Sequence, residues 1–191
     1  RSKMADHPRF MAKLAGRDSA RPMYAAVVDG MDQSIGKVLD TLDTEGLADT
    51  TIVLFFSDNG GAVYAIGGAD NAPLRGGKGD TFEGGIRVVA TVRWPEQIPA
   101  GSRVDSIMSV MDVLPTLAAA AGIEPSTHNR LDGRNMVTAL TEAESIPRED
   151  LLFFIAESPF KNTVNVTAFN DGWKLAEGTE TGVPSGEVTK F

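Results

Sequence analysis

The sequence predicts an α/β fold, built as a sheet domain with a small antiparallel extension that comes last in the chain. Three observations predict it. An amphipathic helix leads into a short apolar strand, and a long glycine-rich loop separates that strand from a second strand and another helix. Several short strands then follow one another near the end of the chain. Helix and strand therefore alternate first, and strands alone close the chain.

The first element expected is a helix from Tyr24 to about Glu45. Its apolar residues recur at spacings of three and four, which places them on one helical face: Val27, Val28, Met31, Ile35, Val38, Leu39 and Leu42. Gly46 then supplies a C-cap. Residues 1–20, which precede this helix, are polar and irregular, and we expect a lead-in without regular structure.

The run Thr51–Phe56 has no alternation of polar and apolar residues. A short, continuous apolar run is typical of a central parallel strand covered by helices on both faces. Residues 57–85 form a long glycine-rich loop, and loops of this length in compact domains are usually functional or disordered. A second strand, Ile86–Trp94, ends at Pro95.

The second half of the chain predicts one helix with clear end signals and a set of short elements. Asp112 is expected to be the N-cap of a helix through Ala121, with Pro115 in its first turn and Gly122 ending it. The shorter elements are a strand at Val104–Val110, a helix at Met136–Leu140, and strands at Leu151–Ala156, Thr163–Phe169 and Trp173–Leu175. The last dozen residues show no clear element. We expect residues 21–148 to belong to the α/β domain and 149–191 to begin a small subdomain.

Composition excludes several classes of function. The net charge of −8 argues against general nucleic-acid binding, which needs a basic face. No apolar run approaches the roughly 20 residues that span a bilayer. Cysteine is absent, so the chain offers no disulfide, no thiolate metal site and no cysteine nucleophile. The chain opens with Arg1-Ser2-Lys3, and we expect it to be a piece of a longer protein.

Asp58 and Asn59 follow the apolar strand directly, in the motif Ser-Asp-Asn-Gly-Gly. Open α/β sheets place their ligand sites at the carboxyl ends of strands. A carboxylate beside an amide oxygen suits a hard divalent cation such as Ca²⁺ or Mg²⁺, and glycines allow a close approach. The alternative is an Asx-turn that simply ends the strand.

Arg75 and Lys78 stand among glycines in the stretch 71–87 and are suited to binding an oxyanion, Lys as a point charge and Arg as a planar fork. The spacing is not that of a Walker A loop. For Arg75, substrate contact and structural pairing both remain open. For the segment from Glu83 to Arg87 we favour a turn with an internal ion pair.

These motifs together resemble the sulfatase family of the alkaline-phosphatase superfamily. The resemblance is carried by SDNGG (57–61), PLRGGKGDTFEGGIRV (73–88), VMDVLPTLAAAAG (110–122) and DGWKL (171–175). The order and spacing of the motifs cover most of residues 21–175. The form of the loop is most similar to the branch that includes N-acetylgalactosamine-4-sulfatase and the arylsulfatases.

The resemblance implies an alkaline-phosphatase-like mixed sheet flanked by helices, and a hydrolase acting on a sulfate-ester small molecule or a sulfated carbohydrate. It implies that Asp58 and Asn59 bind Ca²⁺ and that Lys78 contacts the sulfate group. In the family a formylglycine nucleophile, two further Asp ligands and a catalytic His come from an N-terminal half. This chain has neither the formylglycine signature nor that half, so we expect it to be inactive alone.

Two other functions remain open: hydrolysis of phosphodiesters or phosphonate esters in the same superfamily, and a catalytically inactive sulfatase-like module. His7 and His128 have no surrounding motif, and we expect both to be surface residues. The sequence does not fix the compartment; the resemblance implies a periplasmic or secreted protein.

Overall fold

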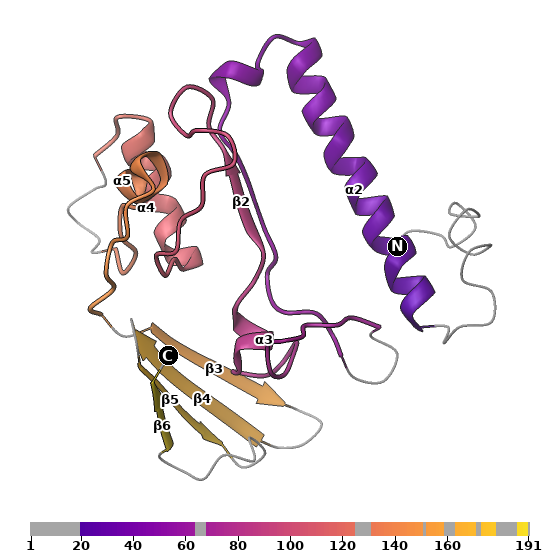
Figure 1. The fold of residues 1–191 in the computed structure, drawn as a ribbon, viewed down its shortest axis with the longest axis vertical. Coiled ribbons are helices and arrows are strands. Elements are labelled where there is room, and N and C mark those ends of the chain that lie inside the picture. Colours follow the sequence, from indigo (N-terminus) through magenta and orange to yellow (C-terminus); the bar gives the residue numbers. More distant parts are fainter. Residues whose placement is uncertain are drawn as a thin grey trace.

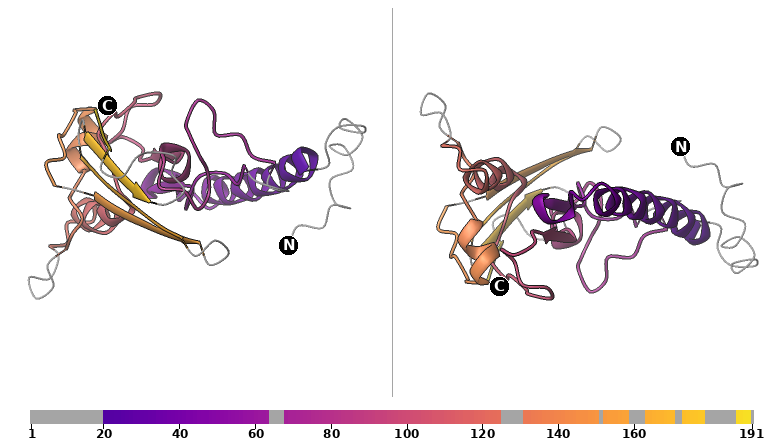
Figure 2. Two further views of the ribbon diagram at one scale, coloured as in Figure 1. Left: turned by 90° about the horizontal axis from the view of Figure 1, so that it is seen from below. Right: turned by 90° about the horizontal axis from the view of Figure 1, so that it is seen from above.

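The computed structural model describes residues 20–63, 68–124, 131–150, 152–158, 163–170, 173–178 and 187–190. A long helix, α2, stands beside a pair of strands, β1 and β2 (Figure 1). Two short helices, α4 and α5, lie on the other side of this pair, and the late strands form a separate sheet. That sheet and α2 lie on opposite sides of the molecule (Figure 2). His7 and His128 fall outside the described residues.

The expected first helix is confirmed, and α2 runs from Ala20 to Thr44. Gly46 ends it with a φ of 66°, a conformation that glycine adopts without steric cost. Leu47 N donates to Leu42 O at 2.8 Å and Gly46 N to Asp43 O at 3.2 Å, which is the paired closing pattern of a Schellman motif. None of the described helices combines the length and the apolar character needed to span a bilayer.

The environment expected for the first strand is wrong in this chain. β1 (Val53–Phe56) pairs antiparallel with β2 (Ala90–Arg93), and the two form a two-stranded sheet within the described residues. Leu54 and Phe56 are 36% and 37% exposed, so the apolar run is not covered on both faces. A run without polar residues predicts that a strand is covered on both faces. It does not predict which elements cover the strand.

Of two other expected strands, one is confirmed with shorter bounds and one is wrong. The strand predicted for Ile86–Trp94 is shorter, because Glu83–Ile86 form a single helical turn, α3, whose two glycines are buried. Residues 104–109 form no strand, and Val110–Asp112 form a short 3₁₀ helix, η3. A further 3₁₀ turn, η2, covers Ala48–Thr50.

Helix α4 (Val113–Ala120) is confirmed, and Asp112 occupies its N-cap position as expected, but without a side-chain capping bond. The side chain of Asp112 makes no cap to α4; Ser109 and Asp112 instead form a capping box around η3. Gly122 ends α4 as expected, with a φ of 69°. The expected short helix is α5 (Val137–Glu142). It packs against α4, where Met136 N donates to Thr116 Oγ1 at 3.0 Å.

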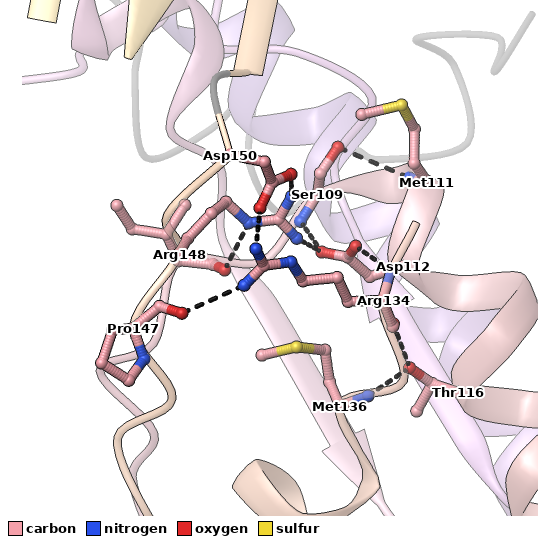
Figure 3. A network of polar contacts seen from close by, with 10 residues as sticks. Ser109, Met111, Asp112, Thr116, Arg134, Met136, Pro147, Arg148 and Asp150 are labelled. Atoms are coloured by element: carbon pink, nitrogen blue, oxygen red, sulfur yellow. Dashed lines mark hydrogen bonds and ion pairs between the residues drawn. The ribbon is translucent and has the colours of Figure 1, made fainter. Parts of the chain in front are cut away.

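A buried polar network joins α4 to the segment that leads into the late sheet (Figure 3). Asp112 and Arg148 form an ion pair whose side chains are 0% and 1% exposed. The other oxygen of Asp112 accepts from Arg134 N at 2.8 Å. Arg148 also pairs with Asp150 at 3.1 Å, and Arg134 pairs with the same carboxylate. Two cations and two carboxylates therefore fix the approach to the late strands.

The late strands form an antiparallel sheet in the order β3-β4-β5-β6. Their bounds are Leu152–Ser158, Thr163–Asn170, Trp173–Gly178 and Glu187–Lys190. The first three strands were expected, whereas β6 corrects the expectation that the chain ends without an element. In Figure 1 this sheet lies next to α3, the helical turn at the lower end of the β1–β2 pair.

Candidate functional site

The candidate site begins where β1 ends. Ser57 N donates to Val89 O at 3.2 Å, which continues the strand pairing by one bond. Ser57 Oγ then donates to the carbonyl of Asn59 at 2.7 Å and bends the chain. Within the described residues, the side chains of Asp58 and Asn59 make no hydrogen bond or ion pair. An Asx-turn needs a side-chain bond to the backbone, so this alternative receives no support.

Asn71 joins this segment to the glycine-rich loop. Its Oδ1 accepts from Gly61 N at 3.0 Å, and its Nδ2 donates to Gly61 O at 2.9 Å. The same Nδ2 donates to Gly76 O at 3.1 Å. Sequence reasoning gave Asn71 no role. Its place before Ala-Pro in the motif is the one local sign, because asparagine is common where a side chain must bond to nearby backbone.

Lys78 lies in a tight turn that contacts the Asp58 segment through the backbone. Lys78 N donates to Gly61 O at 3.1 Å. Gly77 N donates to Asp80 Oδ2 at 2.8 Å, and Asp80 N donates to Gly77 O at 2.9 Å, which closes the turn. The Lys78 side chain is exposed and has no ion-pair partner in the part of the chain that is described. The structure thus brings the backbone of Lys78 next to Gly61, two residues beyond Asn59.

The glycines of this region make room for backbone rather than for side chains. A Cβ added to Gly60 would collide with the carbonyl of Gly84, and one added to Gly84 would collide with the carbonyl of Gly76. Gly60 N donates to Gly85 O at 2.8 Å and Gly84 N to Arg75 O at 2.7 Å. Three chain segments therefore meet at contact distances that only glycine allows.

Arg75 and the segment 83–87 have contacts inside the loop. The guanidinium of Arg75 lies 4.0 Å from the ring centroid of Phe82, a cation–π arrangement. Arg87 and Glu83 form the expected ion pair across one helical turn, at 3.9 Å. With 67% of the Arg87 side chain exposed, this pair contributes little to stability.

The described acidic side chains do not form a complete metal site by themselves. No group of three or more His, Cys, Asp or Glu residues gathers in the described ranges. Asp58 and Asn59 offer oxygen ligands of the kind that Ca²⁺ and Mg²⁺ prefer, and both side chains are uncommitted. The pair therefore has donor atoms that fit part of such a coordination shell.

A family model and the sequences of known proteins that are similar to this chain all carry the name of a sulfatase. The family model described as Sulfatase matches residues 4–123. Steryl-sulfatase of Rattus norvegicus is 42% identical over 147 residues, which cover 74% of this chain and 25% of that protein. N-acetylgalactosamine-6-sulfatase of Homo sapiens is 38% identical over 143 residues, which cover 74% of this chain and 27% of that protein.

A solved structure shares the fold over nearly the whole chain. Ps i-CgsB, crystallised in complex with k-i-k-neocarrahexaose, is 32% identical and superposes with a TM-score of 0.81. The match covers 96% of this chain and 39% of the Ps i-CgsB chain. The chain thus spans about a quarter of the length of the curated relatives it matches.

Proposed function

Since the chain belongs to the sulfatase family, we propose that it forms the C-terminal half of a sulfuric ester hydrolase. One observation carries the proposal. The turn that holds Lys78 is bonded at 3.1 Å to Gly61, two residues beyond Asn59, so adjoining backbone segments carry Lys78 and the two oxygen ligands, whose side chains have no partner in the part of the chain described. This arrangement suits an anion held between a metal ion and a lysine.

Asp58 and Asn59 would hold a Ca²⁺ ion, with Mg²⁺ as the alternative. When bound, the metal supplies positive charge beside the sulfate oxygens. Asp58 contributes a carboxylate that is exposed and Asn59 an amide oxygen that is half-buried. Ca²⁺ takes about six to eight oxygen ligands, so the rest of the enzyme and the substrate would complete the shell.

Lys78 would bind the sulfate group and stabilise the charge that develops on its oxygens during ester cleavage. Its turn is closed by two bonds between Gly77 and Asp80, one to the Asp80 carboxylate and one between backbone groups, so the lysine is presented from a fixed base. Preorganised charge of this kind costs no reorganisation at the moment of reaction. Lys78 acts here as a binding and charge-stabilising group, and the nucleophile would come from the formylglycine-bearing half.

The apolar surface of α2 and β1 supports a missing partner half. Residues that should be covered in a finished domain are exposed, Val27 by 51% and Val38 by 59%. A groove of about 410 Å³ separates α2 from the strand pair. It is lined by Val28, Met31, Asp32, Ile35, Leu39, Val53, Phe55, Thr91, Val92 and Arg93. Exposed apolar area on this scale marks an interaction surface, and the N-terminal half of the same enzyme is the proposed occupant.

The substrate would be a sulfate ester of a small molecule or of a carbohydrate. Two relatives carry the names of a steryl sulfatase and an N-acetylgalactosamine-6-sulfatase. Ps i-CgsB, similar over 96% of this chain, was crystallised with an oligosaccharide. Because that likeness combines 32% identity with 96% coverage of this chain, a sulfated carbohydrate is the substrate class we favour.

The test uses the full-length enzyme and an aryl sulfate. We expect Lys78→Met to lower kcat/KM by about 10²- to 10³-fold, the usual effect of removing one preorganised charge-stabilising group. Asp58→Ala should abolish the strong Ca²⁺ signal in calorimetric titration. Lys37→Met, on the exposed face of α2, is the matched control and should leave both quantities unchanged.

Two outcomes would contradict the proposal. Faster turnover of an aryl phosphate than of the sulfate would favour phosphodiester or phosphonate-ester hydrolysis. Absence of turnover of both esters by the full-length protein, with Ca²⁺ affinity unaffected by Asp58→Ala, would favour an inactive sulfatase-like module.

A further inference from the structure

The late sheet contacts the loop of Lys78 through a buried hydrogen bond. Thr167 Oγ1, in β4, donates to the backbone carbonyl of Thr81 at 3.3 Å, across 86 positions of sequence. Thr167 is 0% exposed and Thr81 is 2% exposed. Water cannot replace such a bond when it is lost, so the carbonyl of Thr81 would remain unpaired.

Thr81 is directly connected to the turn that presents Lys78. The preceding residue, Asp80, closes that turn by two bonds with Gly77, at 2.8 and 2.9 Å. The turn is bonded in addition to Gly61 through Lys78 N at 3.1 Å. A displacement of Thr81 would therefore move a short, stiff segment rather than be absorbed by a flexible loop.

The hydroxyl of Thr81 plays no part in this contact. Its Oγ1 is buried and has no hydrogen-bond partner among the described residues. The connection to the sheet runs through the carbonyl of Thr81, and the hydroxyl that makes it belongs to Thr167. This separates the roles of the two threonines and makes Thr167 the residue to change.

We propose that Thr167 is a positioning residue, through which the late sheet sets the place of Lys78 relative to Asp58 and Asn59. The proposal rests on the function proposed above for Lys78. It assigns the late sheet a part in the reaction although Thr167 itself contacts neither Lys78 nor the ester. The reason is geometric, since a charge-stabilising group acts only from the correct distance.

The first experiment compares variants of the full-length enzyme on an aryl sulfate. Thr167→Val keeps the shape and removes the hydroxyl; we expect kcat to fall by about 5- to 50-fold with KM changed by less than about 2-fold. Thr167→Ser keeps the donor and should restore most of kcat. Thr141→Val is the matched control, because it removes a threonine-to-carbonyl bond of 3.1 Å within α5, and it should leave kcat and KM unchanged.

The second experiment reads the position of the loop without activity. Hydrogen exchange of peptides covering residues 76–86 should be faster in Thr167→Val than in the unaltered enzyme, and unchanged in Thr141→Val. Unchanged exchange and unchanged kcat in Thr167→Val would overturn the proposal. A Thr167→Ser variant as impaired as Thr167→Val would also overturn it, because packing and not the hydroxyl would then matter.

Should Thr167→Val fail to fold, the unaltered enzyme provides the test. In rising urea, amides of 76–86 should open together with those of β4, as one cooperative unit. Opening of 76–86 at lower urea, while β4 stays protected, would overturn the proposal. If the full-length enzyme cleaves no sulfate ester, the proposed function fails, whereas the exchange results still decide whether Thr167 holds the loop.

Discussion

The carboxamide of Asn71 pairs with both backbone polar groups of Gly61, accepting from its N–H at 3.0 Å and donating to its carbonyl at 2.9 Å. These are the two hydrogen bonds that a residue of a neighbouring β-strand would make with the backbone of Gly61. Because Nδ2 also reaches Gly76 O at 3.1 Å, a single side chain ties the segment of the proposed metal ligands to the loop of Lys78. Asn71 thus fixes two parts of the candidate site to each other.

Asn71→Asp should separate these two segments. The carboxylate can still accept from Gly61 N, but it cannot donate and it places negative charge against two carbonyl oxygens. We expect the free energy of unfolding to fall by about 1–3 kcal/mol, measured by urea denaturation, and the affinity for Ca²⁺ to weaken in titration.

Asn135→Asp is the matched control for that change. Asn135 is exposed, and among the described residues its side chain accepts one hydrogen bond, from Val137 N at 3.0 Å, and donates none. A carboxylate can therefore replace the amide without losing a donated bond. We expect a change within about 0.5 kcal/mol. Equal effects of the two substitutions would mean that the donor bonds of Asn71 contribute nothing.

The features that sequence reasoning placed correctly are local ones. The face of α2 follows from apolar spacing, and Gly46 and Gly122 were identified as helix ends because glycine tolerates the positive φ values observed there. The roles of Asp58, Asn59 and Lys78, chosen as residue types suited to a metal and an anion, stay predictions. Each of these signals lies within a few residues of the feature that it predicts.

The features that were missed depend on contacts between distant segments. Asp112 occupies the expected N-cap position, but its carboxylate is used by Arg148, 36 positions away, and does not cap the helix. The glycines were expected to clear room for a ligand, whereas they let three backbone segments meet. β1 was expected to be covered on both faces, whereas Leu54 and Phe56 are 36% and 37% exposed. No periodicity in the sequence predicts contacts between segments that lie so far apart along the chain.

Gly84→Ala should be severely destabilising. The added Cβ would collide with the carbonyls of Gly76 and Arg75, both backbone atoms that cannot move away as a side chain would. We expect a loss of at least about 3 kcal/mol, measured as a shift of the denaturation midpoint.

Gly36→Ala is the control for this prediction. Gly36 lies inside α2, and its added Cβ would meet nothing within 4 Å. Replacing a helical glycine by alanine should stabilise the protein by about 0.5–1 kcal/mol. If Gly84→Ala were as well tolerated as Gly36→Ala, the close backbone contact would be disproved.

Asp112→Ala should be among the most damaging substitutions on the α4 side of the chain. It would remove one of the two carboxylates that pair with the buried Arg148, and with it the acceptor for Arg134 N. Breaking a buried pair in this way costs about 3–5 kcal/mol. Chemical denaturation followed by near-ultraviolet circular dichroism would measure the loss.

Asp105→Ala removes a carboxylate from the Arg103–Asp105 pair, whose side chains are 80% and 72% exposed. Exposed pairs contribute little, so no measurable change in stability is expected. A loss of stability as large as that of Asp112→Ala would show that burial does not govern the cost.

Arg75 is predicted to act within the loop and not on the substrate. Its guanidinium already lies over the ring of Phe82 at 4.0 Å, and such a contact near the surface is worth about 0.5–1 kcal/mol. Arg75→Met keeps the apolar stem and removes the charge, so we expect a stability loss of that size. The KM for an aryl sulfate should change by less than about 2-fold, because the charge does not bind the ester.

Phe82→Leu provides the second half of a double-mutant cycle. If the pair is the source of the stability, the double variant should lose less than the sum of the two single variants, by about the value of the contact. Additive losses, together with a rise of about tenfold or more in KM for Arg75→Met, would instead identify Arg75 as a substrate ligand. The cycle therefore separates the two roles that the sequence left open, because a ring contact couples Arg75 to Phe82 and an ester contact does not.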